Sequence, residues 1–429
     1  LVWRRMNVSE HKQGVVPRLR FPEFRDAGPW EKHSLADLEN NGWIELGRGQ
    51  VISQIDIKEH PGPYPVYSSS TKNDGLMGKY GRFMFDEELI TWSIDGGGDF
   101  FYRPKHKFSV TNVCGYLRVY SSLLNNRFIA FQLQTLHASL TFDYQFKAHP
   151  SVIRKLYTIH VPSLLEQQKI ADCLSSLDEL IQLETQKLDA LKAHKKGLMQ
   201  QLFPREGETT PRLRFPEFRD AGPWEVKRLG EVYRLIPTKS FSRERLTYNS
   251  GAVRNIHYGD IHTKYHALFD IERERVPFIV GLENEFEDDC YCVPGDIVFA
   301  DASEDLADIG KAIEVVNVGS EKVVAGLHTL HARQLANNLV VGFGCYLFQA
   351  DSVRDQIRKQ AQGAKVLGIS ASRLKLVRLL LPEKEEQQKI ADCLSSLDEL
   401  ITLQAQKLDA LKAHKKGLMQ QLFPQEISA

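Results

Sequence analysis

The sequence predicts an α+β protein in which two globular domains of mixed strands and helices are joined by two long helices. Two long segments occur almost unchanged twice, EQQKIADCLSSLDELI at 166–181 and 386–401 and QKLDALKAHKKGLMQQLFP at 186–204 and 406–424. A shorter one, PRLRFPEFRDAGPWE, fills both 17–31 and 211–225. The inserts 32–160 and 226–380 do not closely resemble each other. We call the repeated segments the frame. Because the frame is nearly identical in the two copies and the inserts differ, the inserts are expected to carry the specificity.

Bulk composition is that of ordinary globular domains. A chain of 429 residues is too long to fold around a single hydrophobic core. Its composition, with 42% hydrophobic and 26% charged residues, is typical of folded proteins. The net charge of zero argues mildly against a polyanionic partner for the whole surface, but it leaves local basic patches open. No apolar run is long enough to span a membrane, and residues 1–30 contain no stretch typical of a secretory signal.

The six cysteines are scattered along a chain that is much longer than the small secreted domains held together by disulfides. We therefore expect reduced thiols and a cytoplasmic protein. Cys290 and Cys292 could form half of a metal site, but no second Cys/His pair at a suitable spacing follows. No metal site is expected.

The repeated segment has the pattern of a helix that packs along one other helix. Ser163 is the expected N-cap, Glu166 has capping-box spacing, and Pro204 ends the segment. About forty residues give a helix of about 60 Å, and the second copy runs from about Lys384 to Phe423. Apolar residues recur alternately every four and three positions, with Glu184 and Lys195 in the gaps, at Ile170, Leu174, Leu177, Ile181, Leu188, Leu191, Leu198 and Leu202.

One such helix cannot bury its own seam, so we expect the two copies to pack on each other. The alternative, in which each helix packs only on its own globular domain, stays open. An antiparallel pairing that places Glu184 opposite Lys415 also places Lys195 opposite Gln404. Polar residues in a seam typically fix the register, which makes this pairing a hypothesis. It would also pair Leu188 with Leu411 and Leu191 with Leu408.

Both inserts contain short apolar and aromatic runs between turn residues, which predict strands. A helix is expected near 126–139 and another near 344–362. The strand candidates are GRFMFDEELITWSI, FFYRP, SVTNVCGYLRVY and IRKLYTIHVP in the first insert, and GAVRNIHYGDI, CYCVPGDIVFA, KAIEVVNV and LKLVRLLLP in the second.

Two polar loops are candidates for recognition. YSSSTKNDGLMGKYG at 67–81 and RNIHYGDIHTKYH at 254–266 combine hydroxyls, amides, cations and glycines that can reach base edges and phosphates. The alternative for each is a solvated surface loop. DGGGDF at 95–100 lacks the ending of a phosphate-binding loop and predicts a tight turn, and for His328 and His331 ordinary packing is favoured over a ligand pair.

The sequence contains no recognised catalytic motif: neither a methylation motif of the Asn-Pro-Pro-aromatic type, nor Gly-x-Ser-x-Gly, HExxH or a Walker lysine. We therefore expect no catalytic residues and no enzyme activity.

The chain resembles the specificity subunit of type I restriction–modification systems. The resemblance lies in the two junctions IHVPSLLEQQKIADCLSSLDELI (159–181) and LLLPEKEEQQKIADCLSSLDELI (379–401). PRLRFPEF before each insert, YPVYSSSTKNDGLMGKYG in the first insert and PGDIVFA in the second support it. The first insert departs from this pattern, because EELITWS stands where the second insert has PGDIVFA.

This resemblance implies two target recognition domains, at 1–162 and 205–382, that each read half of a bipartite sequence in double-stranded DNA. The spacer helices, at 163–204 and 383–424, would form an antiparallel coiled coil with pseudo-two-fold symmetry, with the C-terminal LFPQE near the first PRLRFPEF. They would bind two modification (methyltransferase) subunits, which supply S-adenosylmethionine, so this chain would bind no cofactor. Restriction/translocase subunits would complete the complex.

The residues expected at these interfaces are polar and come from the loops and the outer helix faces. The alternative is a coiled-coil scaffold with two protein-binding modules. The expected DNA-binding residues are Ser69, Ser70, Lys72, Asn73, Lys79, Arg254, His257, Tyr258, Lys264 and Lys365, and the expected partner-binding residues are Lys192, Lys196, Lys412 and Lys416.

Overall fold

The computed structural model describes residues 15–70, 72–95, 99–140, 147–281, 286–363 and 365–424, and they form two compact units. The first unit contains the chain up to Thr185 together with the residues from Gln406 onward, and the second unit contains Gln186–Ala405. The long helices α5 (Leu164–Leu202) and α11 (Lys384–Leu422) each contribute one half to each unit. No helix in the described part of the chain is long and apolar enough to cross a membrane.

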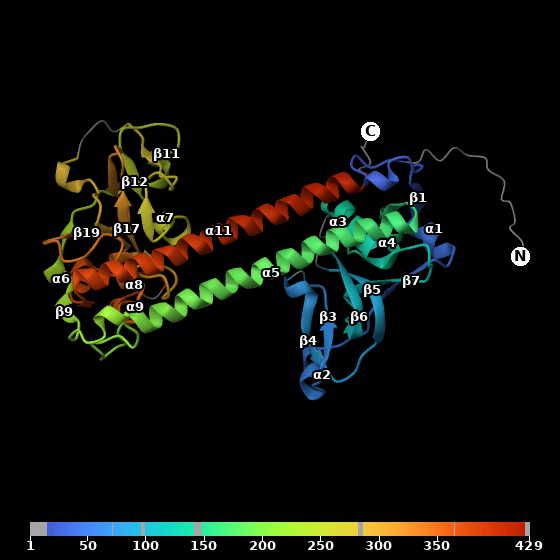
Figure 1. Ribbon diagram of the computed structural model, residues 1–429, viewed down its shortest axis with the longest axis horizontal. Coiled ribbons are helices and arrows are strands. Elements are labelled where there is room, and N and C mark those ends of the chain that lie inside the picture. The colour runs from blue at the N-terminus through green and yellow to red at the C-terminus, as the bar shows by residue number, and fades with distance from the viewer. Residues whose placement is uncertain are drawn as a thin grey trace, which may run out of the picture. The chain divides into compact units, whose positions relative to one another are not determined.

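The first unit contains a six-stranded sheet in the order β2-β7-β5-β6-β3-β4 (Figure 1). Its strands are β2 (Ile44–Arg48), β7 (Cys114–Val119), β5 (Phe85–Ser93), β6 (Phe100–Val110), β3 (Tyr64–Tyr67) and β4 (Leu76–Tyr80). Neighbouring strands are antiparallel except β3 and β6, which are parallel. The helices are α1 (Leu35–Asn40), α2 (Gln54–Glu59), α3 (Asn126–Ala138) and α4 (Pro150–Leu156).

Helix α3 confirms the helix expected near 126–139 and buries Phe128 and Leu133 in the core of the first unit. The strand prediction for IRKLYTIHVP is wrong in its first half. Pro150 occupies the first position of α4, where its fixed φ favours a helix, and only β8 (Thr158–Val161) is extended.

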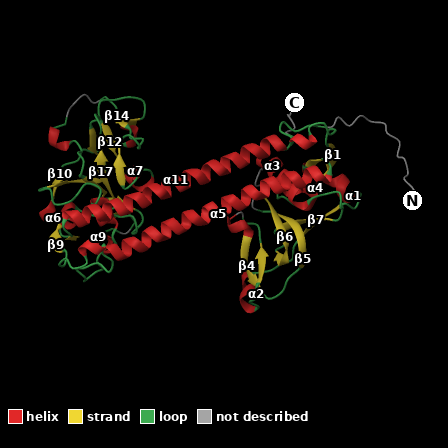
Figure 2. Ribbon diagram, in the orientation of Figure 1, coloured by secondary structure: helices red, strands yellow, loops and turns green. Residues whose placement is uncertain are grey.

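The second unit contains a five-stranded and a four-stranded sheet (Figure 2). The first has the order β10 (Tyr233–Ile236), β19 (Thr329–Gln334), β15 (Ile297–Ala300), β17 (Ala312–Asn317) and β13 (Leu268–Asp270). The second has the order β11 (Leu246–Thr247), β14 (Phe278–Ile279), β12 (Arg254–Ile256) and β18 (Val323–Ala325), and β16 (Ala302–Ser303) pairs with β20 (Leu367–Gly368). Strands β12 and β18 are parallel.

The helices of the second unit's insert are short. They are α6 (Leu229–Val232), α7 (Tyr258–Thr263), α8 (Gly344–Gln349), α9 (Asp351–Gln360) and α10 (Ala371–Leu374). The single helix expected near 344–362 is interrupted, because Ala350 has an extended backbone (φ −60°, ψ 136°) between α8 and α9. Short 3-10 turns over both units cover Pro22–Phe24, Lys72–Gly75, Pro216–Phe218, Arg243–Arg245 and Asp288–Cys290.

The repeated sequence forms the same frame in each unit. Strand β1 (Glu31–Ser34) pairs antiparallel with β8, and β9 (Glu225–Arg228) pairs antiparallel with β21 (Arg378–Leu381), so the strand after each lead-in joins the strand before each long helix. The N–H of Leu19 donates to the carbonyl of Gln421 at 3.0 Å, as that of Leu213 does to Gln201. The expected closeness of the C-terminal segment to the first lead-in is confirmed through Pro424; residues 425–429 lie outside the described part.

A buried ion pair fixes each lead-in to the start of a long helix. Arg20 meets Glu166 at 2.7 Å and Arg214 meets Glu386 at 2.5 Å, and these side chains are at most 7% exposed. Ser163 caps α5 as expected, since its hydroxyl accepts from the N–H of Glu166. The expected capping box is half wrong, because the Glu166 carboxylate binds Arg20 and the indole N–H of Trp30.

The two long helices pair antiparallel in both units. In the first unit Lys415 pairs with Asp178 at 2.5 Å and Lys407 pairs with Glu184 at 2.5 Å. Residue numbers therefore decrease along α11 as they increase along α5, which makes the pairing antiparallel. In the second unit Lys195 meets Asp398 at 2.5 Å. The predicted coiled coil is therefore confirmed, and the alternative in which each helix packs only on its own domain is wrong.

The predicted register of this pairing is wrong. Glu184 meets Lys407, eight residues before the expected Lys415, and Lys195 meets Asp398, six residues before the expected Gln404. The leucine pairs that depended on that register fail with it. A heptad seam repeats itself after seven residues, so the seam alone does not distinguish two registers one heptad apart.

The buried carboxyl of Glu314 on β17 accepts hydrogen bonds at 2.8 Å from the backbone N–H groups of Gly342 and Cys345, at the start of α8. Burial raises the pKa of Glu314 to about 7, although these hydrogen bonds act to lower it. A carboxyl whose pKa is raised by folding holds a proton that the unfolded chain releases. Its contribution to stability is therefore present below the unfolded pKa and is lost as the pH rises through about 7.

The Lys415–Asp178 pair gives a direct test of the observed register. Lys415→Glu places two carboxylates side by side and should lower the free energy of unfolding by about 1 kcal/mol, a modest value because both groups are partly exposed. Asp178→Lys in the same chain should restore most of the loss in chemical denaturation, whereas Glu184→Lys should not. Rescue by Glu184→Lys alone would support the register that the sequence predicted.

Glu314 should make stability fall between about pH 4.5 and pH 7, by about 1.4 kcal/mol per pH unit at most. Denaturation of Glu314→Gln should show a smaller fall over this range than the parent protein, because the variant lacks the buried carboxyl that titrates there. Glu244→Gln, at an exposed position of the same unit, is the control and should follow the parent. Parallel pH profiles for the parent and Glu314→Gln would contradict the assignment.

Candidate nucleic-acid interface

In the first unit the candidate recognition loop, Ser68–Gly75, follows strand β3. Because β3 and β6 are parallel, their carboxyl ends lie at the same edge of the sheet. The hydroxyl of Thr111, which follows β6, donates to that of Ser68 at 3.1 Å, and the hydroxyl of Ser93 donates to the carbonyl of Ser69 at 2.6 Å. The loop is thus attached to the ends of three strands.

The buried guanidinium of Arg103 holds the loop against the sheet through hydrogen bonds. Arg103 on β6 donates to the carbonyl of Asp74 at 2.5 Å and to the hydroxyl of Thr91 at 3.0 Å. Its guanidinium lies 3.7 Å from the centre of the Tyr67 ring, a cation–π contact. Burial lowers the pKa of Arg103. The sequence analysis did not select Arg103, because its contact with the loop spans 29 positions.

The loop has an unusual backbone. Asn73 and Asp74 both have φ of 51°, in the left-handed region that L-residues rarely occupy. Gly75 follows with φ of 79°, and a Cβ there would lie 3.0 Å from the carbonyl oxygen of Ser68. Such strain persists only where the surroundings fix it, and it clusters at functional sites.

The expected DNA-binding residues of the first insert fall into two groups. The hydroxyl of Ser70 accepts from the N–H of Lys72 at 3.1 Å, so Ser70 shapes the turn that carries the exposed Lys72 and Asn73. Ser69 is half-buried beside them and Lys79 is exposed on the neighbouring strand β4. The structure therefore brings Ser69, Ser70, Lys72 and Asn73 together after β3, with Lys79 outside this group.

The second unit has a comparable edge, after the parallel strands β12 and β18. His257 follows β12 and His328 lies in the turn after β18, so the two are close in space although 71 positions apart. The ring of Tyr258 connects them, with its centre 4.8 Å from His257 and 5.2 Å from His328.

Two of the expected DNA-binding residues in this unit make contacts within the unit. Arg254 pairs with Glu321 at 3.0 Å and donates to the carbonyl of Val276 at 2.9 Å. His257 is buried and accepts from the N–H of Gly259 at 3.1 Å, which makes it the N-cap of α7. Burial, together with the nearby Arg243, lowers the pKa of His257 and favours its neutral form.

The other three expected residues of this unit are accessible. Tyr258 is partly exposed, and Lys264 is exposed and pairs with the carboxylate of Asp260 at 2.9 Å. Lys365 is exposed before β20; within the described residues, no hydrogen bond or ion pair joins it to the cluster around α7.

The structure adds cations that the sequence analysis missed. Arg243 also pairs with Asp260, at 2.6 Å, and Arg275 and Lys264 both lie over the ring of Tyr248. Burial acts to raise the pKa of Asp260, but Arg243 and Lys264 outweigh it and lower that pKa. The run KSFSRER at 239–245, three cations around one aromatic residue, was a signal for part of this group.

The lysines expected to bind partners are exposed on the long helices. In the second unit Lys192 and Lys196 line a shallow cavity of about 250 Å³ between α5 and the α8–α9 junction, together with Lys195 and Asp351. In the first unit the equivalent lysines are Lys412 and Lys416, and Lys415 between them lies over the ring of Phe131.

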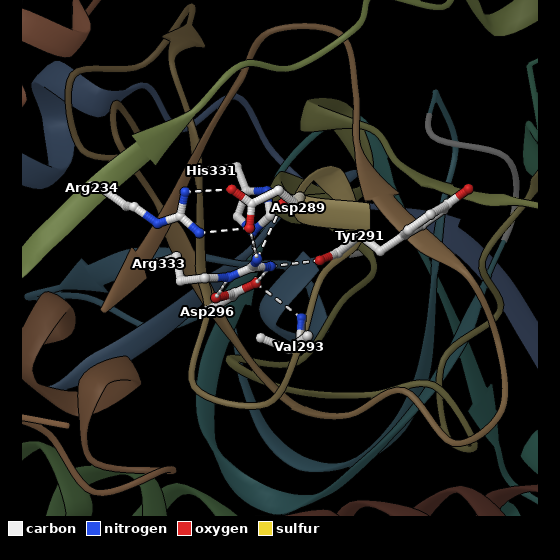
Figure 3. Close-up of polar contacts among 7 residues, drawn as sticks. All are labelled: Arg234, Asp289, Tyr291, Val293, Asp296, His331 and Arg333. Carbon is white, nitrogen blue, oxygen red and sulfur yellow. Dashed lines mark hydrogen bonds and ion pairs between the residues drawn. The ribbon is translucent and has the colours of Figure 1, made fainter. Parts of the chain in front are cut away.

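A buried polar network near β15 is the strongest candidate for a metal site in the described residues. Ligand atoms of Cys292, Asp296 and His331 lie within 4.8 Å of one another. Figure 3 shows, however, that the Asp296 carboxylate already accepts hydrogen bonds from its neighbours. It accepts from the ring of His331 at 2.7 Å, from the N–H of Val293 at 2.9 Å and twice from Arg333, at 2.7 and 3.0 Å.

The guanidinium of Arg333 already supplies a positive charge to the Asp296 carboxylate, and it also pairs with Asp289, which binds Arg234 (Figure 3). We therefore assign this network to the internal structure of the second unit. His328 pairs with Asp301 rather than with this group, so the two histidines do not form a ligand pair.

A family model described as the type I restriction modification DNA specificity domain matches residues 28–193 and 222–413. A putative type I specificity subunit of Mycoplasma pneumoniae is 34% identical over 157 residues, which are 35% of this chain and 49% of that protein. The chain thus spans about half the length of this relative. The type I restriction enzyme MjaVIII specificity subunit of Methanocaldococcus jannaschii is 24% identical over 95% of this chain and 94% of its own.

A solved structure gives the same fold. The crystal structure of the type I restriction–modification system S subunit from M. genitalium has a TM-score of 0.60 at 14% identity, and the match covers 96% of this chain and 100% of that one. The repeated frame, the paired long helices and the two inserts therefore have one explanation. The chain belongs to the family of type I restriction–modification DNA specificity domains, of which it carries two.

Proposed function

We propose that each unit reads one half of a bipartite sequence in double-stranded DNA. In the first unit the reader is the Ser68–Gly75 loop, and in the second it is the edge formed by Tyr258, His328 and the surrounding cations. The observation that carries the proposal is that in each unit exposed polar residues follow a pair of parallel strands, at the carboxyl edge of the sheet. Asn side chains can pair with base edges, and Lys and Arg neutralise phosphates.

The long helices would set the spacing between the half-sites. Each contains 39 residues, which corresponds to a length of about 58 Å. Half-sites read on one face of a duplex are about 34 Å apart, one helical turn. A paired helix longer than that distance can hold two readers and leave surface for other subunits.

Those other subunits would be two modification subunits, which bind S-adenosylmethionine and methylate adenine, and restriction/translocase subunits that complete the complex. This chain supplies recognition and no catalysis, and it would act in the cytoplasm, on the cell's DNA. Lys192 and Lys196 in the second unit, with Lys412 and Lys416 in the first, would contact the modification subunits. Their exposure and their identical placement in the two copies support this assignment.

A gel shift with duplex DNA in the presence of the modification subunits, over a range of salt concentrations, tests the proposal. Sequence-specific binding whose affinity falls with salt is expected. Mapping of methylated adenines in DNA from the native host should show two short conserved blocks separated by a fixed spacer. Binding to proteins without any DNA binding would favour a scaffold with two protein-binding modules instead.

Two substitutions in the recognition loop of the first unit should have different effects, one on the affinity for DNA of any sequence and one on sequence specificity. Lys72→Gln should weaken binding about equally for all sequences and reduce the salt dependence by about one phosphate contact. Asn73→Gly keeps the left-handed backbone but removes the amide, and it should relax one position of one half-site by about 1–3 kcal/mol. Binding titrations against base-substituted duplexes measure both effects. If both variants bind and discriminate like the parent, this loop is not the reader.

The exposed lysines should control assembly with the modification subunits. Lys192→Glu with Lys196→Glu, and separately Lys412→Glu with Lys416→Glu, should each release one modification subunit, because charge is reversed on the docking face. The mass of the complex in solution measures this. Lys187→Glu, exposed on the opposite face of α5, is the control and should leave the complex intact. Full assembly of both double variants would place the docking surface elsewhere.

A further inference from the structure

We infer that His328 determines specificity in the second recognition domain, and that its imidazole accepts a hydrogen bond from the major-groove amino group of a cytosine or an adenine. The inference rests on the proposed function, in which the second unit reads one half-site. His328 was considered in the sequence only as a possible metal ligand, and its position in the fold gives it a different role.

The backbone of His328 is held in an unusual conformation. Its φ is 51°, and within the described residues the other non-glycine residues with positive φ are Asn73 and Asp74, in the candidate loop of the first unit. In each unit, therefore, the left-handed non-glycine residues lie in a turn that follows a parallel strand. Glycine would adopt this conformation without strain, so a histidine here indicates that its side chain is needed.

The turn that carries His328 is fixed on both sides. The hydroxyl of Thr329 donates to the carbonyl of Gly326 at 2.6 Å, and the N–H of Asp301 donates to the carbonyl of His328 at 3.0 Å. The N–H of Gly326 donates to the carbonyl of Ile256 at 3.0 Å and so attaches the turn to the end of β12. The position of the imidazole is thus set by the sheet.

The side chain is exposed and oriented. It is 52% exposed, and its Nδ1 lies 3.2 Å from a carboxylate oxygen of Asp301. Because a carboxylate accepts, Nδ1 carries the proton, and in the tautomer that has only this proton Nε2 presents a lone pair. In the described residues Nε2 has no hydrogen-bond partner. The ring of Tyr258 stands at 74° to the imidazole, with the two centres 5.2 Å apart, and restricts its rotation.

An oriented acceptor of this kind selects among bases. In the major groove, cytosine N4 and adenine N6 are donors, whereas guanine O6 and N7 and thymine O4 are acceptors. Cations near His328 can contact the DNA backbone. Arg243 lies 3.3 Å from His257, and the ring of Tyr258 packs on His257. Arg243 and Lys264 are 47% and 51% exposed, and they can contact phosphates on either side of the base.

His328→Gly in the full-length chain, assembled with its modification subunits, tests the inference. Glycine removes the imidazole and suits the left-handed backbone, so the Tm should stay equal to that of the parent or rise. One position of one half-site at which the parent requires cytosine or adenine on the contacted strand should accept all four bases. Binding to the parent target should weaken about ten- to hundred-fold, with binding to unrelated duplex unchanged. Methylation mapping and binding to duplexes substituted at each position give the two readouts.

His266→Ala, at another exposed histidine of the same unit that pairs with Glu274, is the control and should keep the parent's specificity. If His328→Gly discriminates like the parent at every position, the inference falls while the parent's own sequence-specific methylation still supports the proposed function. If a duplex whose base at the relaxed position lacks its major-groove amino group binds the parent complex as tightly as the intact target does, the assignment of an amino donor is overturned. A parent complex without sequence preference would overturn the proposed function itself.

Discussion

The burial of the helix seam is the constraint on which the rest of the structure depends. An amphipathic helix of 39 residues cannot cover its own apolar stripe, and here each long helix is covered by the other in both units. Ile170 and Leu174 belong to the core of the first unit, and Leu202 of the same helix belongs to the core of the second. Each helix is therefore part of two hydrophobic cores, and the first unit is formed by two separate stretches of sequence.

The duplicated contacts explain how the frame accommodates different inserts. The buried pairs Arg20–Glu166 and Arg214–Glu386, and the exposed pairs Lys169–Glu23 and Lys389–Glu217, are made by residues of the repeated segments alone. The removal of one partner from a buried pair costs about 3–5 kcal/mol, so these residues have little freedom to vary. The inserts share hydrophobic cores with the frame, and one carries a six-stranded sheet where the other carries two smaller sheets. Apolar packing tolerates substitution if volume is kept, which allows the recognition surface to change while the frame stays the same.

The features that could be predicted from sequence are those encoded locally. A heptad pattern with a cap and a terminal proline is read directly from neighbouring residues, and α5 and α11 follow it. The register could not be predicted, because a shift of seven residues leaves the seam unchanged and the ion pairs of Asp178 and Asp398 lie outside it. Residues were chosen for the DNA interface by type, and type does not show what a side chain meets in the fold. Arg254 meets Glu321 and His257 caps α7, while Arg103, far along the chain from the loop it supports, was missed.

The charge distribution of the second unit affects how strongly such a protein would distinguish its target from other DNA sequences. Arg243 and Lys264 share the buried carboxylate of Asp260, and elsewhere in the unit Arg234 and Arg333 share Asp289, so the positive charge of these four side chains is locally balanced. Affinity for DNA of any sequence grows with the number of phosphates that free cations neutralise. Balanced cations still donate directed hydrogen bonds, but they attract the duplex less at long range. A recognition domain built in this way gives up non-specific affinity, and a larger share of its binding energy then depends on the few oriented groups that touch bases. The neutral charge of the whole chain is consistent with that division.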